Sequence, residues 1–204
     1  MIRRRDMFSD LLPGIRIGID MDGGLADFNT GWMTRYNADF GTDLDASMVQ
    51  QWDGLYTLTH FDSMHEFWAW AQGDGRSTFR DAPPLAGAIE SIKRIGQQHR
   101  VCIVSSKFDW AIPDSLAWLA DHGVPAREVH FLWDKTLAQC DIYLDDAPHQ
   151  LEELTAGVPD AVVCRMVHPW NDPMEGVVDV HSWAEFEQVV ERVAAEREAS
   201  RLGD

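Results

Sequence analysis

Four short apolar runs constrain the fold of this chain more than any other feature of its sequence. They cover residues 15–19, 101–104, 141–144 and 161–164. Each run is nearly continuous in hydrophobicity rather than alternating, which is typical of strands that are buried on both faces of a parallel sheet. Helical patterns separate the runs, so the sequence predicts an α/β fold built around a doubly wound parallel sheet.

The helical patterns are clearest in three places. Apolar residues recur with a period near 3.6 between Leu85 and Ile95, and a shorter helix is predicted to end at Gly123. Ser182 and Glu185 have the spacing of a capping box, which predicts that the last helix begins there.

Residues 29–81 interrupt this alternation, because they lack buried-strand runs and are rich in aromatic side chains. We predict that they form a small, mostly helical cap inserted just after the first strand. Residues 14–28 and 82–198 are then predicted to form the core, and residues 1–13 an N-terminal tail.

Oxygen-bearing side chains follow three of the apolar runs, and a lysine precedes the third run by one short turn. These residues are Asp20, Asp22, Ser105, Ser106, Asp145, Asp146 and Lys135. Because the carboxyl ends of parallel strands meet at one edge of a sheet, we expect all of these side chains at the same rim. Carboxylates gathered there would repel one another unless a cation lay among them. Oxygen ligands without nearby Cys or His favour magnesium over zinc.

This set of groups suits phosphoryl transfer. One carboxylate can attack phosphorus and form an aspartyl-phosphate that water hydrolyses. A second carboxyl group two residues away can protonate the leaving oxygen and then deprotonate the water. A hydroxyl and an ammonium can balance the charge on the phosphoryl oxygens.

The composition limits the partners of the chain. A formal net charge of −17 disfavours nucleic acid polymers, and no stretch of about 18 apolar residues could span a membrane. The three cysteines are scattered and never form a CxxC pair, so a disulfide framework is not expected and a cytoplasmic location fits best. A small phosphorylated substrate stays compatible with the acidity if a bound cation inverts the local field.

Several sequence strings carry a resemblance to a known family. IGIDMDGGLADF, IVSS, Lys135 and YLDDAP occur in the order of the four motifs of the haloacid dehalogenase superfamily, which they resemble. The longer strings DMDGGLADF, PPLAGAIESIKRI, DKTLAQCDIYLDD and HPWND are together similar to the 5'(3')-deoxyribonucleotidases, one branch of that superfamily. The similarity covers roughly residues 15–28 and 82–171.

The resemblance implies a Rossmann-like core and a role for each motif residue. Asp20 would be the nucleophile and Asp22 the general acid and base. Magnesium would be held by Asp20, by the backbone carbonyl of Asp22 and by the Asp145–Asp146 pair. Ser105 and Ser106 would bind the phosphate, and Lys135 would balance the charge of nucleophile and phosphate. The implied substrate is a nucleoside monophosphate, and a homodimer is compatible with the resemblance.

Two residues depart from the family pattern. Gly24 stands where relatives usually carry an apolar residue, which would loosen the turn into the insertion. Lys107 follows Ser106 where the deoxyribonucleotidases usually place proline. Neither departure removes a catalytic group, but both bear on the choice of substrate. One alternative is a phosphatase of the same superfamily that acts on another small phosphorylated metabolite. The other is a non-catalytic nucleotide-binding or regulatory protein.

The aromatic side chains of the insertion allow two interpretations. They can form the packed core of a small cap, or some of them can stack on a substrate base. The residues concerned are Phe28, Trp32, Trp52, Phe67, Trp68 and Trp70. Trp170, Asn171 and Asp172, in the HPWND string after the fourth run, are expected near the same rim, either touching substrate or packing the loop.

Overall fold

A single six-stranded parallel sheet forms the centre of the protein in a computed structural model that describes residues 14–203. The strand order is β3-β2-β1-β4-β5-β6. The strands are β1 (Arg16–Ile19), β2 (Arg100–Ser105), β3 (Glu128–Phe131), β4 (Ile142–Asp145), β5 (Val162–Met166) and β6 (Val178–Val180). The predicted doubly wound α/β fold is thereby confirmed. The predicted tail, residues 1–13, lies outside the described residues.

Strand β1 is central, with β2 on one side and β4 on the other. Ile17 pairs in register with Val101 of β2 and with Ile142 of β4, and all three side chains are fully buried. Burial on both faces explains why these strands read as continuous apolar runs. The outer strands β3 and β6 were not predicted, because β3 is only half-buried and β6 has just three residues.

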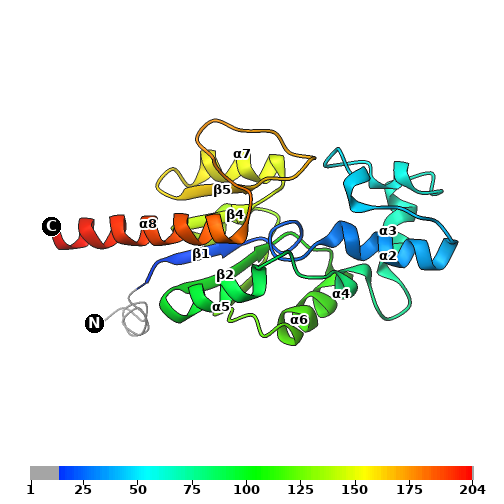
Figure 1. Cartoon of the computed structure of the whole chain (residues 1–204), viewed down its shortest axis with the longest axis horizontal. Coiled ribbons are helices and arrows are strands. Elements are labelled where there is room, and N and C mark those ends of the chain that lie inside the picture. Colours follow the sequence, from blue (N-terminus) through cyan, green and yellow to red (C-terminus); the bar gives the residue numbers. More distant parts are fainter. Residues whose placement is uncertain (1–13, 204) are drawn as a thin grey trace.

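Helices cover both faces of the sheet (Figure 1). Helices α5 (Ala88–Gln98), α6 (Ile112–Asp121) and α8 (Trp183–Gly203) pack on one face. Helix α7 (Pro148–Gly157) and the 3-10 turn η4 (Lys135–Ala138) pack on the other. The helix predicted from Leu85 begins at Ala88. The predicted capping box of α8 forms only in part: the backbone N–H of Glu185 donates to Ser182 Oγ at 3.2 Å, whereas Glu185 Oε2 accepts the backbone N–H of His181 at 2.8 Å.

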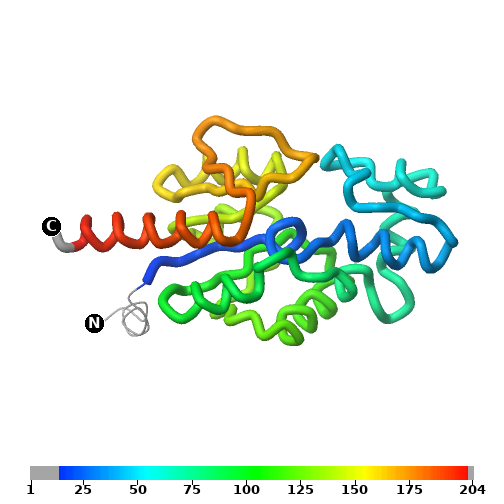
Figure 2. Tube along the Cα trace, in the orientation of Figure 1, coloured from blue at the N-terminus to red at the C-terminus, as the bar shows by residue number. Residues whose placement is uncertain are grey.

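The cap is a separate helical body at one end of the molecule, opposite the end toward which α8 extends (Figure 2). It contains α2 (Phe28–Phe40), η1 (Ala46–Met48), η2 (Leu55–Leu58), α3 (Met64–Gln72) and α4 (Thr78–Asp81), and the 3-10 turn η3 (Asp109–Ala111) of the core lies next to it. Trp32, Tyr36 and Phe67 are buried in a hydrophobic cluster of its own. The predicted helical insertion after the first strand is thus confirmed, whereas the exact domain bounds stay a prediction.

The loop from β1 into the cap fixes where α2 begins. Asp27 caps the helix: its Oδ1 accepts the backbone N–H of Thr30 at 3.0 Å. Gly41, with φ of 67°, ends the helix in the left-handed region. Among the described helices, none is long and apolar enough to cross a membrane.

Candidate active site

Three buried carboxylates meet at the carboxyl ends of the two central strands. Asp20 directly follows β1, and Asp145 and Asp146 end and follow the neighbouring strand β4. Each offers one oxygen, and these oxygens all lie within 4.8 Å of one another. The parallel pairing of β1 with β4 places them together, as the sequence predicted from the strand ends alone.

The turn after β1 is tight because two glycines leave room for the carboxylates. Gly23 has φ of 72°, and a Cβ there would lie 2.3 Å from Asp146 Oδ2. A Cβ at Gly24 would lie 2.5 Å from the carbonyl oxygen of Asp20. The turn at Gly24 is tight, and a side chain there would require the backbone of this turn to shift, whereas the predicted loosening by glycine stays a prediction.

Lys135 connects two of the carboxylates. Its buried Nζ lies 2.9 Å from Asp20 Oδ1 and 2.5 Å from Asp145 Oδ2. Burial alone would lower the pKa of Lys135, but Asp145 and Asp20 outweigh that effect and raise the pKa above its ordinary value. The lysine therefore carries a full positive charge at neutral pH.

One ammonium does not neutralise three carboxylates. Burial raises the pKa of Asp145 to about 6 even though Lys135 opposes the shift. Burial, followed by the charges of Asp20 and Asp145, raises the pKa of Asp146 well above its ordinary value. Each shift means that the charged form is disfavoured, so the cluster is short of positive charge.

The Asp146 side chain shows where a cation fits. Its Oδ2 accepts the indole N–H of Trp170 at 2.8 Å, whereas its buried Oδ1 has no hydrogen-bond partner within residues 14–203. A buried carboxylate oxygen without a donor is costly unless a cation contacts it. Together with Asp20 and Asp145, this oxygen forms a donor set of the hard oxygen type that suits a divalent cation such as Mg²⁺.

Residues of the HPWND string form hydrogen bonds with the backbone next to the acidic cluster. Asn171 donates from Nδ2 to the backbone carbonyl oxygens of Asp146 at 2.8 Å and of Met166 at 2.9 Å. His168 Nε2 lies 2.7 Å from the carbonyl oxygen of Gly23. Trp170 and Asn171 therefore hold one of the aspartates in place, which is a more specific role than either sequence-based alternative.

Ser105 ends β2, on the other side of β1, and Ser106 follows it; both line the cavity above the carboxylates. The hydroxyl of Ser106 donates to the carbonyl oxygen of Leu132 at 2.9 Å. Its proton is thus committed to the backbone, which leaves Ser105 as the better placed hydroxyl donor for an incoming phosphate.

A cavity of about 320 Å³ lies between the rim and the cap. Of the six cap aromatics, Phe28, Trp52 and Trp68 line it, and Trp32, Phe67 and Trp70 do not. Trp32 and Phe67 pack edge to face in the cap interior, with ring centroids 5.2 Å apart.

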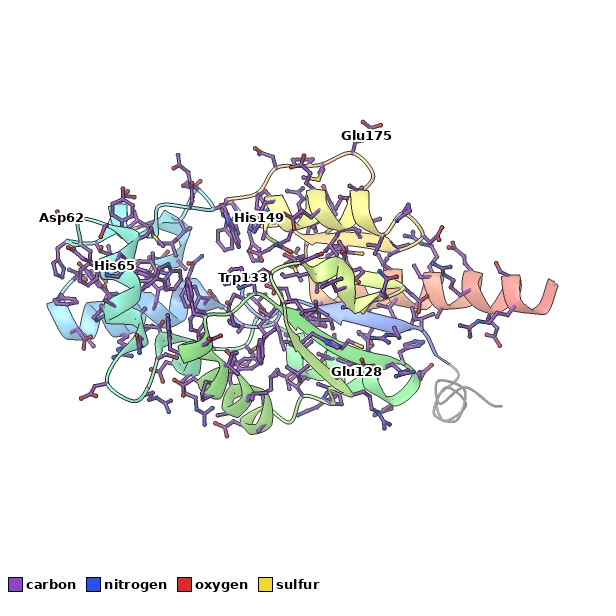
Figure 3. The ribbon with its side chains drawn as sticks, turned by 180° about the vertical axis from the view of Figure 1, so that it is seen from behind. Asp62, His65, Glu128, Trp133, His149 and Glu175 are labelled. Atoms are coloured by element: carbon purple, nitrogen blue, oxygen red, sulfur yellow. The ribbon has the colours of Figure 1, made fainter. Side chains whose placement is uncertain are left out.

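Two residues that sequence reasoning did not assign also line this cavity. Trp133 comes from the core and is 65% exposed, and Figure 3 shows it with His149 in the space between core and cap. Lys107 was noted only as a departure from the family pattern, yet its buried Nζ donates to Asp22 Oδ2. Its place directly after Ser106 was the one signal that could have assigned it to the site.

Comparison with known proteins decides the family. The family described as "5' nucleotidase, deoxy (Pyrimidine), cytosolic type C protein" matches residues 14–197, which is most of the chain. The chain belongs to this family. It is accordingly a phosphatase of the haloacid dehalogenase superfamily.

Curated relatives agree with this family. A putative 5'(3')-deoxyribonucleotidase of Chlorobaculum tepidum is 26% identical over 154 residues, covering 69% of this chain and 73% of the relative. The mitochondrial 5'(3')-deoxyribonucleotidase of Mus musculus is 26% identical over 193 residues, covering 84% of this chain and 82% of the relative.

Solved structures agree on the fold. A haloacid dehalogenase-like hydrolase from Streptococcus pneumoniae has a TM-score of 0.60 at 12% identity and covers 87% of this chain and 98% of its own. A hydrolase of the same superfamily from Deinococcus radiodurans, solved with bound phosphate and sodium, has a TM-score of 0.59 at 15% identity, with 89% and 97% covered.

Proposed function

We propose that this protein hydrolyses the phosphate ester of a nucleoside monophosphate, most favourably a deoxyribonucleotide, through a phosphoryl group carried on Asp20. The observation that carries the proposal is the position of Asp20. It lies at the end of the central strand, held by Lys135 and beside Asp145 and Asp146, on the floor of a cavity with aromatic walls. The family assignment and the deoxyribonucleotidase names of the relatives support the choice of substrate.

In the first half of the reaction, a carboxylate oxygen of Asp20 attacks phosphorus and a new P–O bond forms. The P–O bond to the leaving alcohol breaks, and its electron pair goes to the leaving oxygen, which takes a proton from Asp22. Lys135 holds Asp20 in place and offsets the negative charge of the transferring group. Ser105 donates a hydrogen bond to the phosphoryl oxygens.

In the second half, water attacks the phosphorus of the aspartyl-phosphate. Asp22 takes a proton from that water, the P–O bond to Asp20 breaks, and inorganic phosphate leaves with Asp20 restored as a carboxylate. Asp22 thus acts first as an acid and then as a base, and each cycle consumes one water.

Magnesium fits the donor set described above and would be held by side-chain oxygens of Asp20, Asp145 and Asp146 and by the backbone carbonyl of Asp22. When bound, it supplies positive charge that brings the phosphate and the carboxylate of Asp20 together. Trp170 and Asn171 keep Asp146 oriented for this role.

The cavity walls support a substrate with a flat apolar group. Phe28, Trp52 and Trp68 approach from the cap, and Trp133 from the core. The faces of Phe28 and Trp68 are partly used by Phe79, whose ring stacks with theirs at centroid distances of 4.7 and 6.1 Å. Exposed Trp133 and Trp52 are therefore the better candidates for contacting a base.

Phosphate release by the purified protein tests this proposal. With magnesium present, we expect deoxyribonucleoside monophosphates to react faster than ribonucleotides, sugar phosphates and 4-nitrophenyl phosphate. The Asp20→Asn variant is the contamination control and should be inactive on all of them. Preference for a sugar phosphate would favour the alternative of another small metabolite. Tight nucleotide binding without turnover would favour a non-catalytic protein.

The proposal also covers the cellular location and the oligomeric state of the protein. Cys102, Cys140 and Cys164 are free, buried thiols, which supports a reducing compartment such as the cytoplasm. A homodimer stays a prediction, and the mass of the purified protein in solution would decide it.

A further inference from the structure

Lys107 is a buried cation that none of the proposed catalytic steps uses. The chain contains only three lysines, of which Lys107 and Lys135 are buried at the active site and Lys93 is exposed on α5. The Lys107 side chain is 0% exposed, and its Nζ donates to Asp22 Oδ2. The same Nζ lies 3.9 Å from the ring centroid of Phe79.

A lysine in this place is costly to keep. A buried ammonium loses its hydration, and one ion pair rarely repays that loss compared with an apolar side chain of similar volume. A methionine at position 107 would pack against Phe79 without a desolvation cost. Packing alone therefore does not explain the residue, and its contact with Asp22 becomes the feature to explain.

The Asp22 carboxylate is held at one oxygen only. Within the described part of the chain, Lys107 is the only hydrogen-bond donor to its side chain, and that bond is made to Oδ2. Asp22 lines the cavity and is partly exposed, so Oδ1 is left free for the reacting groups. A carboxyl group fixed at one oxygen presents the other in a defined direction.

The position of Lys107 also links Asp22 to the cap. Lys107 follows β2 in the core, whereas Phe79 belongs to cap helix α4 and stacks on Phe28 at the start of α2. A cation over an aromatic face is held electrostatically. The ammonium is thus fixed from the cap side by Phe79 and from the core side by Asp22.

We propose that Lys107 is a positioning residue: its ammonium holds Asp22 Oδ2 so that Oδ1 faces the leaving oxygen. The inference rests on the proposed function, because it takes Asp22 as the group that gives a proton to the leaving alcohol. Two other roles predict different kinetics. A phosphate-binding cation would act equally on all esters, and a purely structural cation would act on stability and on all esters in parallel.

Esters whose leaving groups differ in their need for a proton separate the three possible roles of Lys107. We compare kcat/KM for phenyl phosphate, whose leaving oxygen needs a proton, with 4-nitrophenyl phosphate, whose leaving oxygen hardly does. This ratio reports only the steps through transfer of phosphate to Asp20. For Lys107→Met we expect a loss of about tenfold to a hundredfold on phenyl phosphate, part of the about 10²–10⁴-fold that general acid catalysis supplies, and a loss of at most about threefold on 4-nitrophenyl phosphate. Equal losses on both esters would overturn the proposal.

Two variants serve as controls for this comparison. Lys93→Met makes the same substitution at an exposed site on α5 and should leave both rates unchanged. Lys107→Gln keeps a hydrogen-bond donor without the charge and provides a second test if the methionine variant does not fold. We expect it to retain more of the phenyl phosphate rate than Lys107→Met. A larger loss than in Lys107→Met would contradict positioning through a hydrogen bond.

A double-mutant cycle with Asp22 completes the test. If Lys107 acts through Asp22, Lys107→Met should cost nothing further on phenyl phosphate once Asp22→Asn is present. Independent, multiplying losses would overturn the inference and leave the proposed function standing. If Asp22→Asn alone left the phenyl phosphate rate intact, the proposed role of Asp22 would fail, and the inference would fall with it.

Discussion

The rim and the cap of this protein differ in how their residues acquire a role. At the rim, Asp20, Asp145 and Lys135 are brought together by the order and direction of the strands, and their charges depend on one another. In the cap, chemically similar aromatic residues serve different purposes: Trp68 lines the cavity, whereas Phe67 next to it is buried in the interior. Strand topology therefore determines the roles of the polar residues at the rim, and local packing determines the roles of the aromatic residues in the cap.

Removing the divalent cation should have the largest effect on the activity of the rim residues. A chelator is expected to lower phosphatase activity by at least about a thousandfold, because the charge that gathers phosphate and carboxylates is lost. Added magnesium should restore it, as measured by phosphate release. Full activity in excess chelator would remove the metal from the mechanism.

The same removal should leave a pH signature in stability. The pKa of Asp145 is raised to about 6 by burial, so the folded protein favours its neutral form. Stability contributed in this way is present at low pH and is lost as the pH rises through about 6. Without magnesium we therefore expect a lower Tm at pH 8 than at pH 5, and with magnesium a recovery at pH 8. Equal effects of magnesium at both pH values would contradict this.

Lys135→Met tests the charge balance of the rim by removing the lysine ammonium instead of the divalent cation. The loss of the ammonium leaves Asp20 and Asp145 without their shared partner, and kcat/KM for 4-nitrophenyl phosphate should fall about 10²–10³-fold. Lys93→Met is again the matched control. A loss below tenfold would show that the cation alone balances these carboxylates.

Phe67→Ala should affect the cap interior and not the chemistry. Phe67 is fully buried against Trp32, and its truncation is expected to lower the free energy of unfolding by about 3–5 kcal/mol. Urea unfolding measures this loss. We expect kcat on 4-nitrophenyl phosphate to be retained in the folded fraction, and a fully stable variant would show that the cap cluster contributes little.

Trp133→Ala should have the smallest effect and sharpen the question of substrate. The exposed indole is a candidate for stacking on a base, so its loss should raise KM for a deoxyribonucleotide about tenfold, which corresponds to about 1.4 kcal/mol. KM for 4-nitrophenyl phosphate should change less, and kcat should change little for either. A uniform rise in KM for both esters would assign Trp133 to cavity shape instead.

Sequence predicted the features that depend on strand burial and strand ends. Strands β1, β2, β4 and β5 are buried on both faces and read as apolar runs, so their polar ends could be located. Strand β3, with the pattern EVHF, carries polar residues at the sheet edge and gave no such signal. The motif residues then followed from the topology and from the family resemblance.

The remaining features depend on contacts between distant residues. The close approach of the Asp20 carbonyl oxygen to Gly24 depends on the path of the turn after β1, which the sequence does not reveal. That Lys107 reaches Asp22 depends on the pairing of β1 with β2 and on the location of Phe79 in the cap. Which cap aromatics face the cavity depends on the rotation of α2 and α3 about their axes, and the sequence leaves this open because aromatic residues occur on several sides of each helix.

Trapping the phosphoryl group on Asp20 tests the central claim most directly. In the Asp22→Asn variant, 4-nitrophenyl phosphate should still transfer its phosphate, whereas the water step lacks its base. After an acid quench, we predict one phosphoryl group on the peptide that contains Asp20 and none in the Asp20→Asn variant. Stoichiometric release of nitrophenol with no phosphoryl group on the protein, or with the phosphoryl group on another residue, would contradict the account.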